Sequence, residues 1–398
     1  MKLAQRISRL GTESAFEVLA KARKLEAQGK EIIHLEIGEP DFATPKNIAK
    51  AAKKAIDEGW THYTPSAGLM DARKAAAEYI SKTREIKVDP EEVVITVGGK
   101  PVMFYTILAL IDEGDEVICP NPSYPIYESV LNFIGAKIVP IQILEEQNFN
   151  FNTEEFEKLL TPRTKLVILN SPANPTGGVL TAQDMEKIVS ALKKYPDVAV
   201  LSDEIYSEIV YEGKHVSIAS FPGMKDRTVI LDGLSKTFAM TGWRLGFGVF
   251  PKWLEPTITR LTVNSVSCAA AFTQKAAIEA LTGEKSAKAV KKMLREFKKR
   301  RKIIVNGLNE IPGFSCKMPK GAFYAFPNIK NTGLTSPDLE TLILNEAGVA
   351  CLSGTCFGRY GEGYLRFSYA NSIENITKAI ERIKQLSVKW KTAVTSNP

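Results

Sequence analysis

Short apolar segments alternate with longer segments of helical periodicity through the middle of the chain. The apolar segments are rich in β-branched residues and predict strands at 93–97, 116–119, 137–141, 165–170, 198–202, 228–232 and 245–250. Several of them are apolar throughout, which is typical of parallel strands covered by helices on both faces. The pattern therefore predicts an α/β fold, a large domain with a mostly parallel, seven-stranded sheet between helices.

The helical segments carry end signals, and their distribution changes near residue 285. One helix is expected to be capped by Thr44 and to stop at Gly59. Beyond residue 285 the helices are longer and the strands fewer. We therefore expect a large ligand-binding domain over 45–285 and a smaller α+β domain over 286–398, which the N-terminal segment 1–44 joins.

The positive charge of the chain is concentrated in one place. Its 398 residues carry a net charge of +7, but residues 284–302 alone hold ten basic and two acidic residues, +8, which leaves −1 elsewhere. Apolar residues recur in this stretch at helical spacing, at Ala287, Val290, Met293, Leu294 and Phe297. We interpret it as an amphipathic helix with a solvated basic face, and we expect no nucleic-acid partner.

The cysteine and histidine content argues against a metal or disulfide framework. The five Cys include no CxxC pair and the three His are scattered, so we expect no metal site and a reducing, cytoplasmic location. The longest apolar run, 102–111, is about half of what a membrane span needs. We therefore expect no membrane attachment.

Polar residues follow three of the expected central strands. Residues 170–177 read NSPANPTG, 203–206 read DEIY and 233–236 read GLSK. Ligands in open α/β sheets bind at the carboxyl ends of strands, so we expect an amide, a carboxylate, a phenol and an ammonium to meet there. Gly98 and Gly99 separate another strand from a helix, and the free amides at such a helix start can hold a phosphate.

Five ordered motifs closely resemble those of the class I and II pyridoxal-phosphate aminotransferases. They read GEPDF at 38–42, NPTG at 174–177, DEIY at 203–206, GLSKTFAMTGWRLG at 233–246 and YLRFS at 364–368. The resemblance covers nearly the whole chain and is strongest to the aspartate aminotransferase superfamily of fold type I, in the branch that carries MTGWR. It implies a fold type I transferase with pyridoxal 5'-phosphate as cofactor and with an amino acid and a 2-oxo acid as substrates.

The resemblance also implies roles for individual residues around the cofactor ring. Lys236 is similar to the lysine that forms a Schiff base with the cofactor and then moves the substrate α-proton. Asp203 resembles the partner of the ring nitrogen. Tyr206 and Asn174 resemble the residues that hydrogen-bond the ring oxygen, and Tyr124 the aromatic residue that stacks on the ring.

A phosphate site and a substrate site follow from the same resemblance. Arg244 matches the phosphate-binding arginine, assisted by Gly99, Lys100 and Ser235. For the substrate, Arg366 resembles the clamp on the α-carboxylate, with Gly38, Asn174 and Tyr124 beside it.

The resemblance further implies a homodimer. Tyr63 matches a tyrosine that reaches the cofactor phosphate of the other subunit, so the active sites would be shared.

The substrate side chain stays open at this point. Lys100 near the pocket would favour aspartate and glutamate, whereas Phe323 and Tyr324 could accept aromatic amino acids. A carbon–sulfur β-lyase of the same fold type is an alternative activity, since it can share these cofactor residues. A non-catalytic aminotransferase-like regulator is a further alternative that ranks last, because no length is left before Gly38 for a DNA-binding domain.

Overall fold

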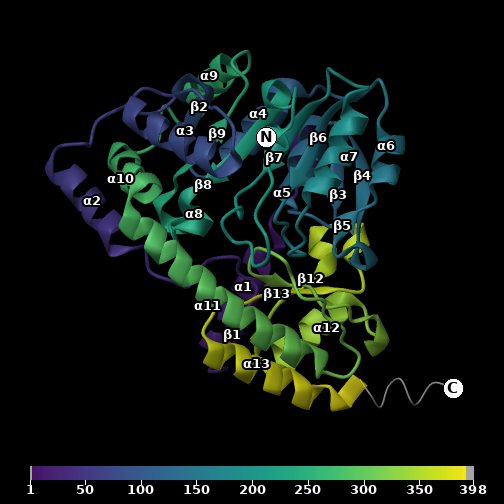
Figure 1. Cartoon of the computed structure of the whole chain (residues 1–398). Helices are drawn as coiled ribbons and strands as arrows, with labels where there is room; N and C mark the ends of the chain where they lie inside the picture. The colour runs from purple at the N-terminus through teal and green to yellow at the C-terminus, as the bar shows by residue number, and fades with distance from the viewer. Residues whose placement is uncertain (1, 391–398) are drawn as a thin grey trace.

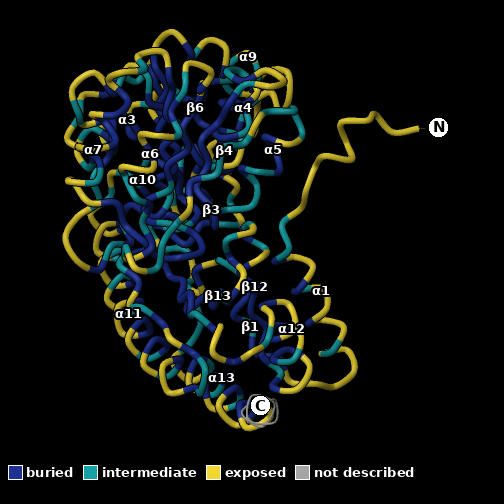
Figure 2. Tube along the Cα trace, turned by 90° about the vertical axis from the view of Figure 1, so that its right-hand side faces the viewer, coloured by how far each residue is buried: buried dark blue, intermediate teal, exposed yellow. Residues whose placement is uncertain are grey.

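The computed structural model describes residues 2–390 and has two lobes, a large one around a central sheet and a smaller one beneath it (Figure 1). Helix α11 (Glu284–Asn309) runs from the large lobe into the small one. Residues 2–10 are exposed, and the chain begins as an arm that extends outward from the body (Figure 2). Within the described residues, none of the helices has the length and apolar character that crossing a bilayer requires.

The large lobe is built on an eight-stranded sheet of order β2-β9-β8-β7-β6-β3-β4-β5. Strands β4, β3, β6, β7 and β8 are parallel, β9 is antiparallel to both β8 and β2, and β5 is antiparallel to β4. The strands are β2 (Val93–Thr96), β3 (Glu116–Asn121), β4 (Lys137–Leu144), β5 (Asn150–Phe151), β6 (Thr164–Asn170), β7 (Ala199–Asp203), β8 (Thr228–Gly233) and β9 (Gly246–Val249). The seven expected strands are confirmed, and the additional β5 is too short to produce a hydrophobic pattern.

Helices cover both faces of this sheet, as the apolar strands predicted. Side chains alternate along a strand, so Val94 packs with α4 and α9 while Val93 and Ile95 pack with α3 and α10. The first face carries α4 (Lys100–Leu110), α5 (Ile126–Ile134) and α9 (Glu255–Ser265). The second carries α3 (Met70–Arg84), α6 (Thr153–Leu159), α7 (Ala182–Leu192) and α10 (Ala271–Thr282), with α2 (Lys46–Asp57) packed on α10.

The small lobe combines short strands with helices from both ends of the chain. Strand β1 (Ile33–His34) pairs in parallel with β11 (Val349–Ala350). A second sheet has the antiparallel order β10-β13-β12, and helix α13 packs against α11. The remaining elements are α1 (Ser14–Ala27), β10 (Tyr324–Ala325), α12 (Ser336–Leu342), β12 (Leu352–Ser353), β13 (Leu365–Ser368) and α13 (Ile373–Leu386).

Two local expectations need correction. Helix α2 begins after Pro45 without a side-chain cap, because the hydroxyl of Thr44 donates instead to the Ala239 carbonyl oxygen, 2.7 Å away. The amphipathic helix expected at 284–302 is confirmed as part of α11, but its basic residues are not all solvated.

The exceptions in α11 are Arg300 and Arg301, which are both buried. Arg300 pairs with Asp41 at 2.6 Å, and Arg301 pairs with Glu212 at 3.1 Å. The Arg300 guanidinium also lies 4.8 Å from the centre of the Phe42 ring. Opposite charges and an aromatic face compensate for the water that these side chains lose.

Candidate active site

A cavity of about 530 Å³ lies between the lobes, at the carboxyl ends of β6, β7 and β8. This volume is in the range of small-molecule sites. Its walls include all of the predicted site residues except Tyr63, namely Gly38, Gly99, Lys100, Tyr124, Asn174, Asp203, Tyr206, Ser235, Lys236, Arg244 and Arg366. Tyr63 is 89% exposed and lies outside the cavity lining.

Lys236 projects into the cavity from α8 (Leu234–Thr237), the short helix that follows β8. Its Nζ donates a hydrogen bond of 2.6 Å to the carbonyl oxygen of Gly38. Burial lowers the pKa of Lys236 to about 8, although the carboxylates of Glu13 and Glu39 oppose the shift. The neutral amine, which can attack a carbonyl carbon, is therefore accessible close to neutral pH.

Asp203 ends β7 and is 6% exposed. Its Oδ2 accepts a hydrogen bond of 2.5 Å from the Tyr127 hydroxyl, and its Oδ1 accepts one of 3.1 Å from the Ile205 amide. Burial raises the pKa of Asp203 to about 6, even though these hydrogen bonds lower it. A positively charged N–H group in the cavity would favour the carboxylate, so the position suits a protonated ring nitrogen.

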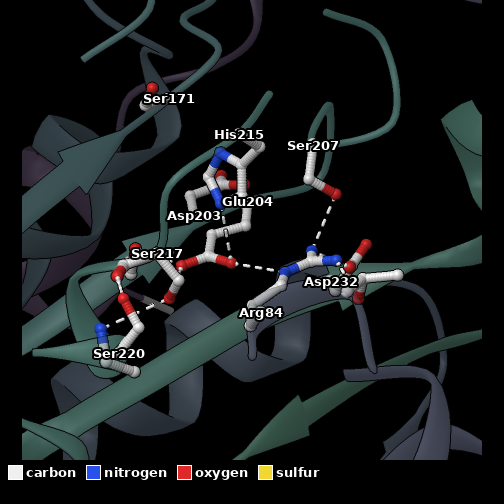
Figure 3. Close-up of polar contacts among 12 residues, drawn as sticks. Arg84, Ser171, Asp203, Glu204, Ser207, His215, Ser217, Ser220 and Asp232 are labelled. Atoms are coloured by element: carbon white, nitrogen blue, oxygen red, sulfur yellow. Dashed lines mark hydrogen bonds and ion pairs between the residues drawn. The ribbon is translucent and has the colours of Figure 1, made fainter. Parts of the chain in front are cut away.

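A buried ion cluster adjoins Asp203 and joins the ends of β7 and β8 (Figure 3). Arg84 Nε lies 2.8 Å from Glu204 Oε2, and Arg84 Nη2 lies 2.5 Å from Asp232 Oδ2. His215 Nε2 lies 3.0 Å from the same Glu204 oxygen. Although burial opposes it, His215 and Arg84 hold the pKa of Glu204 well below its usual value. The cluster thus fixes the strand end that carries Asp203 against the strand that leads into α8.

Two tyrosines meet beside this strand end. The hydroxyl oxygens of Tyr206 and Tyr324 are 2.7 Å apart, and burial raises the pKa of both, so both stay neutral. Tyr324 also lines the cavity. Phe323, the other aromatic residue considered for the substrate pocket, turns into the small-lobe core and stacks on Phe297 at 5.2 Å.

Arg366 on β13 brings to the cavity a guanidinium that forms no ion pair within residues 2–390. Its Nη1 donates to Asn174 Oδ1 at 2.9 Å, and its Nη2 donates to the Glu36 carbonyl oxygen. Its Nε is buried and, among residues 2–390, has no hydrogen-bond partner. The guanidinium lies 4.5 Å from the centre of the Tyr324 ring, which holds it in place. A guanidinium so fixed suits bidentate binding of a carboxylate.

Glycines shape the wall where Arg244 reaches the cavity. A Cβ at Gly98 would lie 2.3 Å from Arg244 Nη2, and a Cβ at Gly246 would lie 2.5 Å from the carbonyl carbon of Gly98. Gly99 precedes α4, whose first amides have no partners within the helix. With Ser235, which also lines the cavity, these groups could hold an anion.

Sequence reasoning missed several residues that matter here. The Tyr127 hydroxyl donates a hydrogen bond to Asp203. Tyr127 lies three residues after Tyr124, and this helical spacing was the one sequence signal that could have indicated that both residues face the site. Arg84, at the end of α3, and Glu13, just before α1, are far in the sequence from their partners Glu204 and Lys100, so these ion pairs left no local pattern.

The chain was compared with known proteins and structures. Residues 30–383 match the family described as aminotransferase class I and II. An aspartate aminotransferase of Pyrococcus abyssi is 42% identical over 92% of this chain and 95% of its own length. Aromatic-amino-acid aminotransferase 2 of Thermococcus litoralis is 43% identical over 90% of this chain and 93% of its own. The structure of the Thermus thermophilus aspartate aminotransferase with maleate superposes with a TM-score of 0.93, at 35% identity over 97% and 100% of the two chains.

We expect pyridoxal phosphate to label Lys236 of the apoprotein at a rate that rises as the pH rises through about 8, because burial lowers its pKa to that value. An ordinary lysine stays protonated up to about pH 10.4. Borohydride reduction at each pH, followed by peptide mass spectrometry, measures labelling at Lys236 and at the exposed control Lys158. A Lys236 profile that rises only near pH 10 would contradict the prediction.

We expect Arg84→Met to lower the free energy of unfolding by about 3–5 kcal/mol, because it leaves Glu204 and Asp232 buried without their shared cation. The matched control is Lys214→Met, which removes one cation from an exposed pair with Glu85 and should cost less than about 1 kcal/mol. Urea unfolding of both variants measures the difference in the free energy of unfolding. Equal decreases in the two variants would show that the buried cluster stabilises the fold no more than an exposed ion pair does.

Proposed function

Because this chain belongs to the class I and II aminotransferases, as a transaminase of the aspartate aminotransferase family, we propose that it moves the α-amino group of aspartate, glutamate or an aromatic amino acid to a 2-oxo acid such as 2-oxoglutarate. The observation that carries the proposal is that Lys236, Asp203 and Arg366 face one cavity. They offer an amine of lowered pKa, a buried carboxylate and a guanidinium free to clamp a carboxylate.

The residues of the cavity fit pyridoxal 5'-phosphate, the cofactor that the family uses. The anion site of Arg244, Ser235 and the amides of Gly99 and Lys100 suits its phosphate, and the Asp203 carboxylate suits its protonated ring nitrogen. When bound, the cofactor supplies the electron sink that makes the α-carbon of an amino acid acidic.

Three residues are proposed to orient the cofactor ring. Tyr124 is placed to pack on its face, and Tyr206 and Asn174 to hydrogen-bond its ring oxygen. The support is that Tyr206 is neutral and buried, and that the Asn174 amide is held by the Arg366 guanidinium. The Tyr324 hydroxyl lies 2.7 Å from that of Tyr206 and either oxygen can be the donor, so Tyr206 can donate to the ring oxygen when Tyr324 is the donor of this pair.

Lys236 and Arg366 are proposed to act on the substrate. Lys236 would hold the cofactor through its amine and, once the amino group of the substrate has taken its place, would take the proton from the substrate α-carbon and deliver it to the cofactor carbon that bears the substrate nitrogen. Arg366 binds the α-carboxylate, and the Gly38 backbone, already 2.6 Å from Lys236 Nζ, lies on the same wall. The lowered pKa of Lys236 matches this work as a base.

The chain is further proposed to work as a homodimer with shared active sites. Tyr63 is 89% exposed, which suits a residue that completes the site of a second subunit, and the exposed arm carries the apolar residues Leu3, Ile7 and Leu10.

Domain boundaries at 44/45 and 285/286 and a cytoplasmic location also remain proposals. The pairing of β1 with β11 supports the assignment of the N-terminal segment to the small domain, and the five free cysteines suit a reducing compartment.

We expect Lys236→Ala to lower the rate of transamination by more than about 10³-fold, because the proton-transferring amine is lost. The visible absorption of the holoenzyme, followed after adding an amino acid without a 2-oxo acid, measures the amination of the cofactor. Lys158→Ala, an exposed lysine paired only with Glu155, is the matched control and should behave as the wild type. Pyruvate release from cysteine conjugates without a 2-oxo acid would instead indicate β-lyase activity.

We expect Arg366→Lys to reduce kcat/KM for amino acids by roughly 10- to 100-fold, because a lysine keeps the charge but loses the two-pronged hydrogen bond. The decisive comparison is with a primary amine that lacks the α-carboxylate, whose slower reaction should not change. A similar loss with both substrates would remove Arg366 from the carboxylate site.

A further inference from the structure

Lys100, which lines the cavity and could bind a carboxylate on the substrate side chain, already forms an ion pair within the chain. Lys100 Nζ lies 2.8 Å from Oε2 of Glu13, the residue that precedes α1. The Tyr124 hydroxyl donates to the same oxygen at 3.2 Å, and Lys100 Nζ lies 5.8 Å from the centre of the Tyr124 ring. The three side chains line the cavity together, so Glu13 is an internal counter-ion for Lys100.

The pair is accessible enough to exchange partners. The Lys100 side chain is 49% exposed and the Glu13 side chain 23%, so water competes with the ion pair. Ion pairs of this exposure are weak, and a substrate carboxylate that arrives at the rim can take the place of Glu13.

The cavity lining also contains a second carboxylate and apolar side chains. Glu39 lines the cavity and accepts a hydrogen bond from Thr241, and among the described residues it forms no ion pair. Phe16, three residues after Glu13, and Ile37 supply apolar surface to the lining. A dicarboxylic substrate would therefore bring a further negative charge into a cavity that already holds Glu13 and Glu39.

We propose that Glu13 is a specificity-determining residue, which competes with the distal carboxylate of a dicarboxylic substrate for Lys100 and so shifts the site toward amino acids with uncharged, aromatic side chains. An aromatic side chain leaves the Glu13–Lys100 pair intact and packs on the apolar rim, whereas aspartate gains Lys100 only by displacing Glu13. This inference rests on the proposed transaminase function and names the feature that sets its substrate preference.

The test is the amination of the holoenzyme cofactor by aspartate and by phenylalanine, each measured by stopped-flow absorbance without a 2-oxo acid. In Glu13→Gln, we expect the ratio of kcat/KM for aspartate to that for phenylalanine to rise about fivefold, the range set by a weak ion pair. The matched control is Glu17→Gln, which removes one negative charge from an exposed position one turn later in α1, outside the cavity lining. The ratio there should not change.

The second arm repeats the Glu13 substitution in a Lys100→Gln background, where we expect no further rise in the ratio because the contested cation is gone. The ratio of the two kcat/KM values does not depend on which fraction of a variant is active, so a partly folded variant still gives a result. An unchanged or lower ratio in Glu13→Gln, an equal rise in Glu17→Gln, or an equal rise without Lys100 would each overturn the inference. Absence of amination by any amino acid in the wild type would instead overturn the proposed function.

Discussion

The buried contact of Arg84 with Glu204 and Asp232 is the constraint on which the geometry of the site depends. Parallel strands bring their carboxyl ends to one edge of a sheet, but they do not by themselves fix those ends to a fraction of an ångström. Here one guanidinium holds the residue after Asp203 and a residue on the strand that leads to Lys236 (Figure 3). Buried carboxylates need a buried cation at close range, so the contacts of Arg84, together with that of His215 to Glu204, fix the relative position of the two strand ends.

The cavity next to this cluster holds three groups, Lys236, Asp203 and Arg366, that form no ion pair within residues 2–390. Burial pushes the pKa of Lys236 down and that of Asp203 up, so both move toward their neutral forms. Arg366 is held by the Tyr324 ring and two oxygen atoms, and its buried Nε has no hydrogen-bond partner among residues 2–390. A ligand group of opposite charge would offset the burial of each of these groups, so binding such a ligand recovers part of the electrostatic cost of burying them.

The parts that could be predicted from sequence are those that leave a local pattern. The apolar strands β6 and β7, the polar residues at their ends and the glycine pair before α4 all have short-range signatures, and Asn170, Asp203 and Gly99 line the cavity in the structure. Glu13 and Arg84 left none, because their contacts with Lys100 and Glu204 arise only from tertiary packing, and Tyr127, which contacts Asp203, left only its three-residue spacing from Tyr124. The buried state of Arg300 was missed for the same reason, since a basic run looks solvated unless its distant partner is known.

The pairing of β1 with β11 has a consequence for how the protein is made. Ile33 lies beside Val349, so the N-terminal strand has no partner in its sheet until more than three hundred further residues have left the ribosome. The strands of the large lobe, by contrast, all lie between residues 93 and 249 and can assemble while synthesis continues. During translation, the N-terminal segment with its apolar helix face therefore stays without its small-lobe partners while the large lobe folds. The small-lobe side of the cavity, which includes Arg366, forms only after the last part of the chain has been synthesised.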